Sequence, residues 1–365
     1  MKEFDIIIIG SGIAGAGLAA HLPENKRILL LEMEAQPGYH STGRSAALFI
    51  RSYGNAVIRT LNDLSLPFFN NPGDYGIDKP LLAQRGVLNL CLHGQDEAYE
   101  AILAENSDLK EITVRQALEH VPLLRADAFS RAAYEYEAHD IDVALLHQSW
   151  LKQAAAKGGV LSCKSRVTGL VNKSTAWQVD TPSESYSAEI IVNAAGAWAD
   201  EIAGLASLSP IGLTPKRRSM AVTPLPKDTG SERWPLFCDA DENWYAKPEA
   251  GKLLISPADA DPVPACDIYV DDMVLAEGID RFEKAVDLDV QRIEHSWAGL
   301  RTFAPDKTPV LGFDPRCQGF FWLAGQGGYG IQTAPAMSRL GAALLQGQST
   351  HPELEAALSP ARFFT

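Results

Sequence analysis

The sequence predicts an α/β fold in which one sheet is assembled from segments far apart in the chain and a second domain is built on a mixed β-sheet. Units of strand, small-residue turn and helix occur at residues 4–32, 189–206 and 319–347. Their strands can share one sheet only if the intervening chain folds elsewhere. From Leu213 to His295 the chain alternates short strands and turns, which is typical of a mixed sheet.

The first unit contains three glycines whose spacing is typical of a phosphate-binding turn. An apolar run at residues 6–9 leads into Gly10, Gly12 and Gly15. The first glycine permits a tight turn, the second lets a pyrophosphate approach the backbone, and the third lets the helix sit close to the strand. The free N–H groups and the positive end of that helix would then face the phosphates.

Glu32 gives the first unit a further feature of a dinucleotide site. It ends a second apolar run, residues 28–31, and lies 17 residues after Gly15, where its carboxylate would accept hydrogen bonds from a ribose. The alternative is an ordinary buried strand and helix with glycines for packing, and it leaves Glu32 unexplained. The whole unit therefore predicts a bound dinucleotide.

Composition restricts the class of protein and its partners. The 365 residues are 46% hydrophobic and 21% charged, with a formal charge of −14, enough for about two soluble domains. This negative charge disfavours nucleic acid and anionic membrane as partners, so an anionic substrate must be attracted by local arginines. The five scattered cysteines lack CxxC spacing and predict reduced thiols, with no disulfide framework or metal site.

The N-terminal apolar stretch resembles a signal peptide only superficially. Glu3 and Asp5 occupy the place of its positive region, and the glycines already have an explanation. No stretch reaches the roughly 18 to 20 apolar residues of a transmembrane helix. We therefore expect a cytoplasmic protein, with peripheral attachment to the inner face of a membrane left open.

Between the first two units the pattern predicts further elements. Residues 33–55 predict a loop that enters a helix near Ser45 and wraps along an extended ligand. Apolar spacing predicts a helix over residues 56–70, and residues 86–92 predict a strand. Two helices are predicted within residues 95–120, the second of which begins at Thr113, and a further helix runs from Asp142 to the glycines at 158–159. Strands are predicted at residues 160–162, 167–171, 177–180 and 189–193.

The last unit predicts a strand at residues 320–324, a glycine loop at 325–330 and a helix over about 331–345. The three units place residues 1–75, 140–205 and 296–365 in the nucleotide-binding domain. Residues 76–139 and 206–295 then form the substrate-binding domain.

Several motifs together resemble one family. GSGIAG with Glu32, STGRSAA (41–47), NAAGAWAD (193–200), WAGLR (297–301) and AGQGGYGIQ (324–332) are similar to the D-amino acid oxidase and glycine oxidase family of FAD enzymes. The likeness is greatest to D-arginine dehydrogenases, through residues 34–47, 215–219, 256–262 and 327–333. The resemblance covers nearly the whole chain. It implies a Rossmann-like FAD-binding domain built from separated segments and a substrate domain whose mixed sheet covers the flavin.

The resemblance also implies which residues hold FAD. They contact the pyrophosphate, the ribose, the adenine or the flavin ring, where the polarity of the last helix stabilises the negative charge of reduced flavin. The expected set is Gly10, Gly12, Ile13, Ala14, Gly15, Glu32, Ser41, Thr42, Arg44, Ser45, Ala46, Val167, Ala194, Gly196, Trp198, Gly327, Gly328, Gly330, Ile331 and Gln332. Relatives with covalent flavin use a cysteine near the WAGLR-like segment. This chain has none there, so we expect noncovalent FAD.

The family binds an amino acid through its carboxylate. Arg301 matches the carboxylate-binding arginine, whose planar guanidinium can donate two parallel hydrogen bonds. Arg218 resembles a further contact, although alone it could be a solvated strand charge. Tyr53 and Tyr245 match tyrosines that close the site, and Gly328 adjoins it. The implied reaction moves a hydride from Cα to flavin N5 without a protein acid or base, and water hydrolyses the imino acid to a keto acid and ammonia.

This sequence departs from D-arginine dehydrogenases at the substrate side chain. Val87 stands where they have a glutamate that recognises the guanidinium, and Leu48 replaces a histidine. Losing that charge partner would cost a desolvated guanidinium about 2 to 5 kcal/mol. We therefore predict neutral or apolar D-amino acid substrates, with a pocket lined by Leu48, Ile50, Val87 and Trp244.

Other functions stay open at this stage. The same scaffold could oxidise glycine, sarcosine, an L-amino acid or a cyclic imino acid. A non-catalytic flavin-binding subunit belongs to a different class, and an NAD-dependent dehydrogenase is a third alternative that leaves WAGLR and GQGGYGIQ without a role. The sequence does not decide between oxygen and a quinone-like carrier as the electron acceptor.

Overall fold

The strands of the three units lie in one sheet. The computed structural model describes residues 1–173, 175–227 and 229–364, and within them this sheet has eight strands. Five run parallel in the order β9-β2-β1-β12-β19. The strands of this first sheet are β1 (Lys2–Ile9), β2 (Ile28–Leu31), β9 (Val160–Ser162), β10 (Gly169–Asn172), β11 (Trp177–Asp180), β12 (Ser185–Asn193), β18 (Val310–Phe313) and β19 (Phe320–Ala324).

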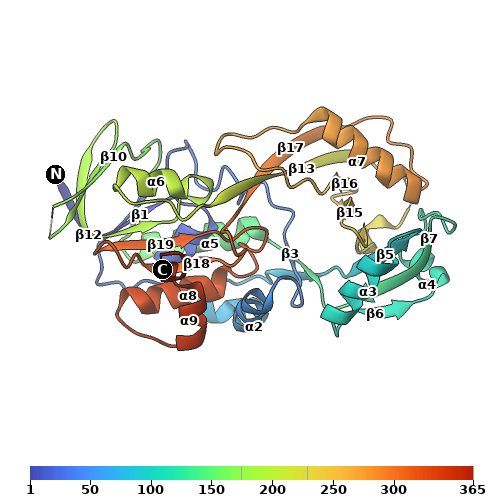
Figure 1. Cartoon of the computed structure of the whole chain (residues 1–365), viewed down its shortest axis with the longest axis horizontal. Helices are drawn as coiled ribbons and strands as arrows, with labels where there is room; N and C mark the ends of the chain where they lie inside the picture. The colour runs from blue at the N-terminus through green and yellow to red at the C-terminus, as the bar shows by residue number, and fades with distance from the viewer. Residues whose placement is uncertain (174, 228, 365) are drawn as a thin grey trace.

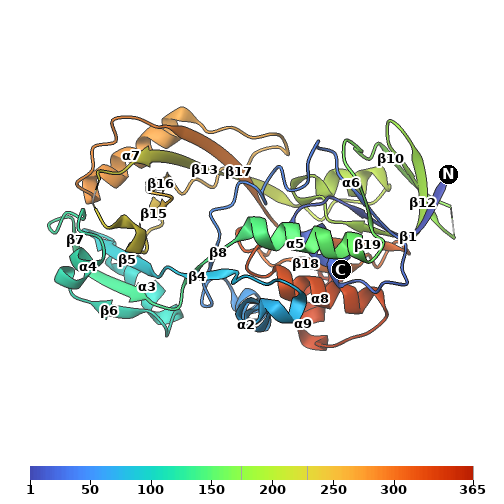
Figure 2. The same cartoon turned by 180° about the vertical axis from the view of Figure 1, so that it is seen from behind.

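Alternating isoleucines bury both faces of the first sheet. Ile7 and Ile9 of β1 pack into a cluster with Trp177 and Trp322. Ile6 and Ile8 point the other way, into a cluster with residues of α1 (Ile13–His21) and α8 (Ala334–Leu345). Burial on both faces is typical of a parallel sheet covered by helices, and Figure 2 shows α5 (Val143–Ala156) lying across this part of the molecule.

A second eight-stranded sheet forms the other end of the elongated molecule (Figure 1). Its order is β17-β13-β16-β15-β14-β5-β7-β6. The strands are β5 (Val87–Leu92), β6 (Lys110–Ile112), β7 (Phe129–Glu135), β13 (Thr214–Pro224), β14 (Leu236–Asp239), β15 (Tyr245–Glu249), β16 (Lys252–Ser256) and β17 (His295–Phe303). It mixes parallel and antiparallel pairs, so the predicted α/β class with a mixed second sheet is confirmed.

A small sheet connects the two ends of the molecule. It pairs β3 (Leu48–Phe49), β8 (His139–Ile141) and β4 (Leu82–Gln84). The remaining helices are α2 (Ala56–Asn70), α3 (Asp96–Glu105), α4 (Val114–His120), α6 (Ala199–Leu205), α7 (Asp272–Ala285) and α9 (Pro352–Leu358). Among the described residues no helix is long and apolar enough to cross a membrane.

Helices with clear start signals were predicted correctly. The side chain of Asn55 accepts a hydrogen bond from the Ile58 N–H at the start of α2. Thr113 and Gln116 form a capping box at the start of α4. Asp142 caps α5 through the Leu145 N–H. Each cap satisfies a backbone donor that the helix itself leaves free.

Two expectations differ from the structure. No helix begins near Ser45, because residues 38–44 form turns and the chain then enters β3 in extended form. The region 213–295 is not only strands and turns, since it contains the 14-residue helix α7. β17 pairs along β13 in the second sheet, and the division into domains, which assigned residues from 296 onward to the nucleotide-binding domain, stays a prediction.

Candidate functional site

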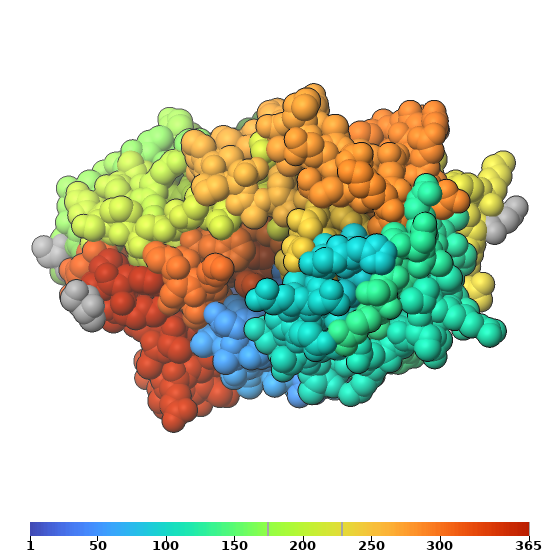
Figure 3. Space-filling view, turned by 45° about the vertical axis from the view of Figure 1, so that its right-hand side comes forward, coloured from blue at the N-terminus to red at the C-terminus, as the bar shows by residue number. Residues whose placement is uncertain are grey.

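One large cavity lies where the two sheets and the small sheet meet. Its volume is about 1240 Å³, above the roughly 300–1,000 Å³ of an ordinary small-molecule pocket. Figure 3 shows the surface hollowed where segments from the beginning, middle and end of the chain come together. Every predicted cofactor or substrate residue borders the cavity except Gly15.

The turn after β1 has room only for glycine at two positions. Gly10 has a φ of +101°, and a Cβ there would lie 2.4 Å from the carbonyl oxygen of Ala194. A Cβ at Gly15 would lie 2.0 Å from the carbonyl oxygen of Gly10. Gly15 therefore brings α1 against β1 without facing the cavity, which is the packing role that the motif predicts for its third glycine.

The first turn of α1 faces the cavity, and Thr42 satisfies one of its backbone donors. The hydroxyl of Thr42 accepts the N–H of Ile13 at 3.0 Å. Ala14, the next residue, lines the cavity. A helix N-terminus of this kind favours an anionic group such as a phosphate.

Glu32 is held in place at the tip of β2. Its carboxylate accepts the hydroxyl and the N–H of Ser11, at 2.7 and 3.1 Å, and the N–H of Glu34 at 3.0 Å. Glu32 is 7% exposed and borders the cavity. The carboxylate is thus oriented before any ribose binds.

His147 fixes the phosphate-binding turn, and the sequence alone did not suggest this residue. Its Nε2 lies 2.8 Å from the carbonyl oxygen of Ser11. A Cβ at Gly38 would lie 2.8 Å from its ring, so α5, the turn and the following loop are packed tightly together. Burial lowers the pKa of His147, which favours the neutral ring. Its placement in the middle of α5 carried no local signal.

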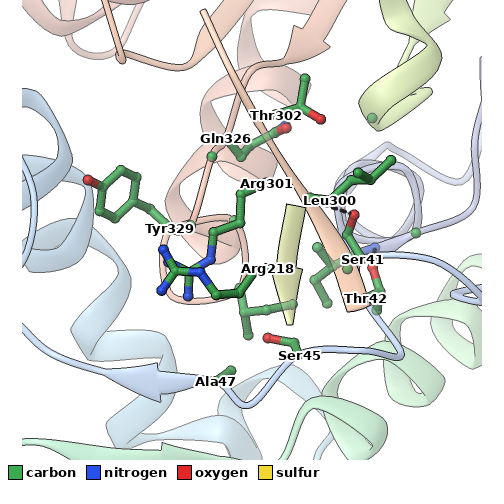
Figure 4. Close-up of a pocket in the computed structure, with 18 of the residues that line it drawn as sticks. Ser41, Thr42, Ser45, Ala47, Arg218, Leu300, Arg301, Thr302, Gln326 and Tyr329 are labelled. Atoms are coloured by element: carbon green, nitrogen blue, oxygen red, sulfur yellow. Dashed lines mark hydrogen bonds between the residues drawn. The ribbon is translucent and has the colours of Figure 1, made fainter. Parts of the chain in front are cut away.

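Arg44 is engaged by protein rather than free for a cofactor. Its guanidinium pairs with Asp267 and donates to the carbonyl oxygens of Ile268 and Ala298, at 3.1 and 3.0 Å. It lines the cavity, but these contacts tie Asp267 and Ile268 to the turns at residues 38–44. Nearby, the Ser41 hydroxyl donates to the Leu300 carbonyl oxygen at 2.7 Å, as the dashed line in Figure 4 shows.

Two arginines point into the cavity without an ion pair to a described carboxylate, although the charge of Glu242, which also borders the cavity, acts on Arg301. Arg301 from β17 and Arg218 from β13 are drawn together in Figure 4, with Tyr329 beside them. Neither forms an ion pair with a described carboxylate, and Arg218 Nε is buried without any hydrogen-bond partner among those residues. Gly328 leaves space for Arg301, because a Cβ there would lie 3.2 Å from its Nη1.

Tyrosines surround the two guanidinium groups. The ring of Tyr245 lies 5.7 Å from Arg218 Cζ, and the rings of Tyr53 and Tyr329 are 5.0 Å apart. Burial works against ionisation of Tyr245, yet the positive charges of Arg301 and Arg218 lower its pKa on balance. Burial raises the pKa of Tyr329 to about 12, so its hydroxyl stays protonated. The lowered pKa of Tyr245 thus reflects the two positive charges beside it.

Buried donors on the glycine loop also lack acceptors. Nε2 of Gln332 and Nε2 of Gln326 have no partner within the described part of the chain, and both residues border the cavity. Gln332 Oε1 accepts the Ile50 N–H at 3.1 Å, which fixes the orientation of the amide. A ligand with carbonyl or ring-nitrogen acceptors, as in a flavin, would satisfy these donors.

The predicted side-chain pocket is mostly apolar. Leu48, Ile50 and Val87 line the cavity, as do Met220 and Leu236, which the sequence did not indicate. Trp244 also borders it, but the residue is fully buried and packs between Phe237 and Phe282, at ring distances of 5.9 and 5.3 Å. Trp244 therefore supports the wall from the core of the second sheet.

The remaining predicted cofactor residues border the same cavity from separate segments. Trp198 packs on His40, with ring centroids 4.6 Å apart, and His40 Nε2 lies 2.9 Å from a Glu34 oxygen. The others are Gly12, Ser45, Ala46, Val167, Ala194, Gly196, Gly327, Gly330 and Ile331.

Comparison with known proteins places this cavity in context. The family model described as "DAO: FAD dependent oxidoreductase" matches residues 5–344. Glycine oxidase from Geobacillus kaustophilus is 24% identical over 376 residues, which cover 95% of this chain and 94% of the relative.

Solved structures share the fold over nearly the full chain. L-proline dehydrogenase from P. horikoshii superimposes with a TM-score of 0.84 at 22% identity, covering 100% of this chain and 98% of that one. L-α-glycerophosphate oxidase from Mycoplasma pneumoniae with FAD bound gives 0.83 at 16% identity, covering 95% of each chain. At these identities the structural likeness establishes the fold alone.

Proposed function

Because this chain belongs to the family of FAD-dependent oxidoreductases, we propose that it catalyses oxidative deamination of D-amino acids and prefers neutral or apolar side chains. FAD as the cofactor follows from the family, whereas the substrate class is our proposal. The amino acid loses two electrons and two protons, and water converts the resulting imino acid into a 2-keto acid and ammonia.

The cavity fits a dinucleotide cofactor at one end. The N-terminus of α1 and the turn at Gly10 suit the pyrophosphate, and Glu32 suits a ribose. Gln332 and the glycine loop suit the flavin ring, because the ring offers acceptors and the unpaired Gln332 amide N–H needs one. When bound, FAD supplies the chemistry by accepting a hydride from the α carbon. Since no cysteine lies in the WAGLR segment, we propose noncovalent binding.

The arginine pair is the observation that carries the proposal. Arg301 and Arg218 lie in the cavity without an ion pair to any described carboxylate, and a guanidinium with a buried, unpaired nitrogen, as Nε of Arg218 is, is unfavourable unless a ligand satisfies it. A planar guanidinium matches the two oxygens of a carboxylate. An amino acid held this way keeps its α carbon in a fixed position, and orientation supplies much of the rate enhancement.

The residues around the arginines suit binding better than proton transfer. Tyr53 and Tyr329 keep their protons because burial raises the pKa of each hydroxyl. They can donate hydrogen bonds to a carboxylate and exclude water. No acid or base is needed in this proposal, since a neutral amine loses its proton to solvent and its lone pair assists hydride loss.

The side-chain preference rests on the walls of the cavity. Leu48, Ile50 and Val87 offer no charge to a cationic side chain. The D configuration is proposed from the motifs shared with D-amino acid enzymes. Relatives named for glycine and L-proline make glycine-type, sarcosine and L-imino acid oxidation the second candidate.

A substrate panel tests the proposal directly. The purified holoenzyme is mixed anaerobically with D- and L-forms of leucine, methionine, phenylalanine, arginine and proline, and with glycine and sarcosine, while flavin absorbance is followed. Fastest bleaching by neutral D-amino acids supports the proposal. A higher kcat/KM for D-arginine, for an L-form or for glycine contradicts it, and no bleaching by any of them favours a non-catalytic subunit. Reoxidation by air or by a quinone-like dye then identifies the acceptor class.

A further inference from the structure

The segment that carries Tyr53 has no regular structure of its own. Residues 50–55 run between β3 and α2 as turns and bends, and Tyr53 stands in the middle of them against Tyr329. One internal bond, from the Tyr53 N–H to the Ile50 carbonyl oxygen at 3.2 Å, spans this segment. Its position therefore depends on side chains from other elements.

On the cofactor side, Asn62 of α2 holds the backbone of the segment. Its Nδ2 donates to the carbonyl oxygens of Ile50, Arg51 and Tyr53, at 3.3, 3.1 and 3.2 Å. Asn62 is fully buried. This anchor belongs to the helix that directly follows the segment, so it does not attach the segment to the second sheet.

On the substrate side, Glu135 at the end of β7 provides the attachment. Both of its carboxylate oxygens lie 3.1 Å from the Ser52 hydroxyl. Asn106 Nδ2 donates to Glu135 at 2.7 Å and to Ser52 Oγ at 2.8 Å, which closes a three-residue cluster. Ser52 and Asn106 border the cavity, whereas Glu135 lies directly behind them.

Glu135 is an unusual group to find in this position. It is 2% exposed, and no described cation pairs with it. Burial raises its pKa, Asp108 adds a like charge, and the donors Asn106 and Ser52 oppose these effects. Across the β5–β7 pair it faces Val87, which is apolar. A buried carboxylate with neutral donors is unfavourable for stability, and such groups cluster at functional sites.

We propose that Glu135 is a positioning residue that, through Ser52 and Asn106, holds the 50–55 segment and hence Tyr53 in place over the substrate site. The role of Tyr53 in catalysis rests on the proposed function. The attachment of the segment does not, because it depends only on the cluster.

Hydrogen exchange of the holoenzyme tests the attachment without any substrate. Glu135→Gln keeps the shape but removes the charge and one acceptor, so exchange at the Tyr53 amide should rise about tenfold, as expected for the loss of one charge-assisted bond. Asp108→Asn removes a nearby charge but keeps the backbone N–H that donates to Asn106 Oδ1 at 2.9 Å, so it should leave this exchange unchanged. Unchanged exchange in Glu135→Gln, or equal acceleration in both variants, would overturn the proposal.

Ser52→Ala provides a second route should Glu135→Gln fold poorly, because on its own it removes the same contact and should also speed exchange at the Tyr53 amide. Where both variants fold, their effects on exchange should be strongly non-additive. Additive effects contradict the cluster. In turnover, both variants should lower kcat/KM by a common factor of about ten across the substrate panel, with flavin content unchanged.

The pattern across substrates separates this proposal from its alternatives. A variant that reorders the side-chain preference, with Tyr53 exchange unchanged, makes Glu135 a recognition group and overturns the positioning role. Faster exchange in the variants, together with no turnover of any amino acid by the wild-type enzyme, refutes the proposed function and still supports the positioning role.

Discussion

Replacing Arg301 by methionine separates a ligand-binding arginine from a structural one. The guanidinium lies in the cavity beside Gly328, and no described carboxylate pairs with it. Burial alone would lower its pKa, but Tyr245 and Tyr53 and the charge of Glu242 raise it on balance, so it is charged. Methionine fills similar volume without charge or donors.

The expected loss of activity follows from two hydrogen bonds to a carboxylate. Each hydrogen bond to a charged group contributes about 1.5–3 kcal/mol, and truncating one partner of such a pair costs about 2–5 kcal/mol. We expect kcat/KM to fall by roughly 10²–10⁴, mostly through KM, because Arg218 remains to attract the substrate. Stability should stay the same or rise, since an unpaired buried charge is removed.

Arg217→Met is the matched control. Arg217 neighbours Arg218 on β13 but pairs with Asp259 and Asp261, both at 3.0 Å, and does not border the cavity. Removing it leaves Asp259, which is 8% exposed, without its cation, so stability should fall by about 3–5 kcal/mol with KM unchanged. Steady-state kinetics and thermal unfolding of the Arg301→Met and Arg217→Met holoenzymes test these two expectations. If Arg301→Met lowers Tm as Arg217→Met does while KM stays within threefold of wild type, the assignment of Arg301 is wrong.

Three further predictions concern the cofactor turn, pH and the side-chain pocket. Gly10→Ala should abolish flavin retention, seen in the visible spectrum of purified protein, because its Cβ would meet the Ala194 carbonyl oxygen at 2.4 Å. Burial lowers the pKa of His21 to about 4, so as the pH falls below 6.5 the unfolded chain binds a proton at His21 before the folded protein does. The free energy of unfolding, measured with urea, should therefore fall by about 2 kcal/mol between pH 7.5 and 4.5, and it should fall by less in His21→Phe. Val87→Glu should raise kcat/KM for D-arginine relative to D-leucine at least tenfold, and an unchanged ratio contradicts the pocket assignment.

The sequence predicted the parts of the fold that local chemistry determines. Gly10 and Gly15 are required by contacts within the first unit and with the turn at Ala194. Asn55 and Asp142 cap the helices that begin directly after them, each by accepting the N–H of the residue three positions later. The caps and the contact between Gly15 and Gly10 lie within one strand–turn–helix unit, so a linear pattern contains them, whereas the contact between Gly10 and Ala194 comes from the tertiary structure.

α7 was missed although its apolar residues recur with a helical period. Its buried residues are Leu275, Gly278, Phe282 and Ala285, which follow a helical period, and Asp271 caps its start. Gly278 interrupts the apolar face, because a Cβ there would lie 2.3 Å from Pro257. A glycine that close packing requires thus resembles a turn residue when only the sequence is read.

Arg44 and Arg301 show which part of a site a sequence leaves undetermined. Both were predicted to bind ligand, and both border the cavity. Arg44 meets Asp267, 223 residues away along the chain, and becomes a structural tie. Arg301 meets tyrosines and a glycine, and although the charge of Glu242 acts on it, no described carboxylate forms an ion pair with it. Whether an arginine serves the fold or a ligand depends on whether the fold brings it a carboxylate, and only the tertiary structure contains that information.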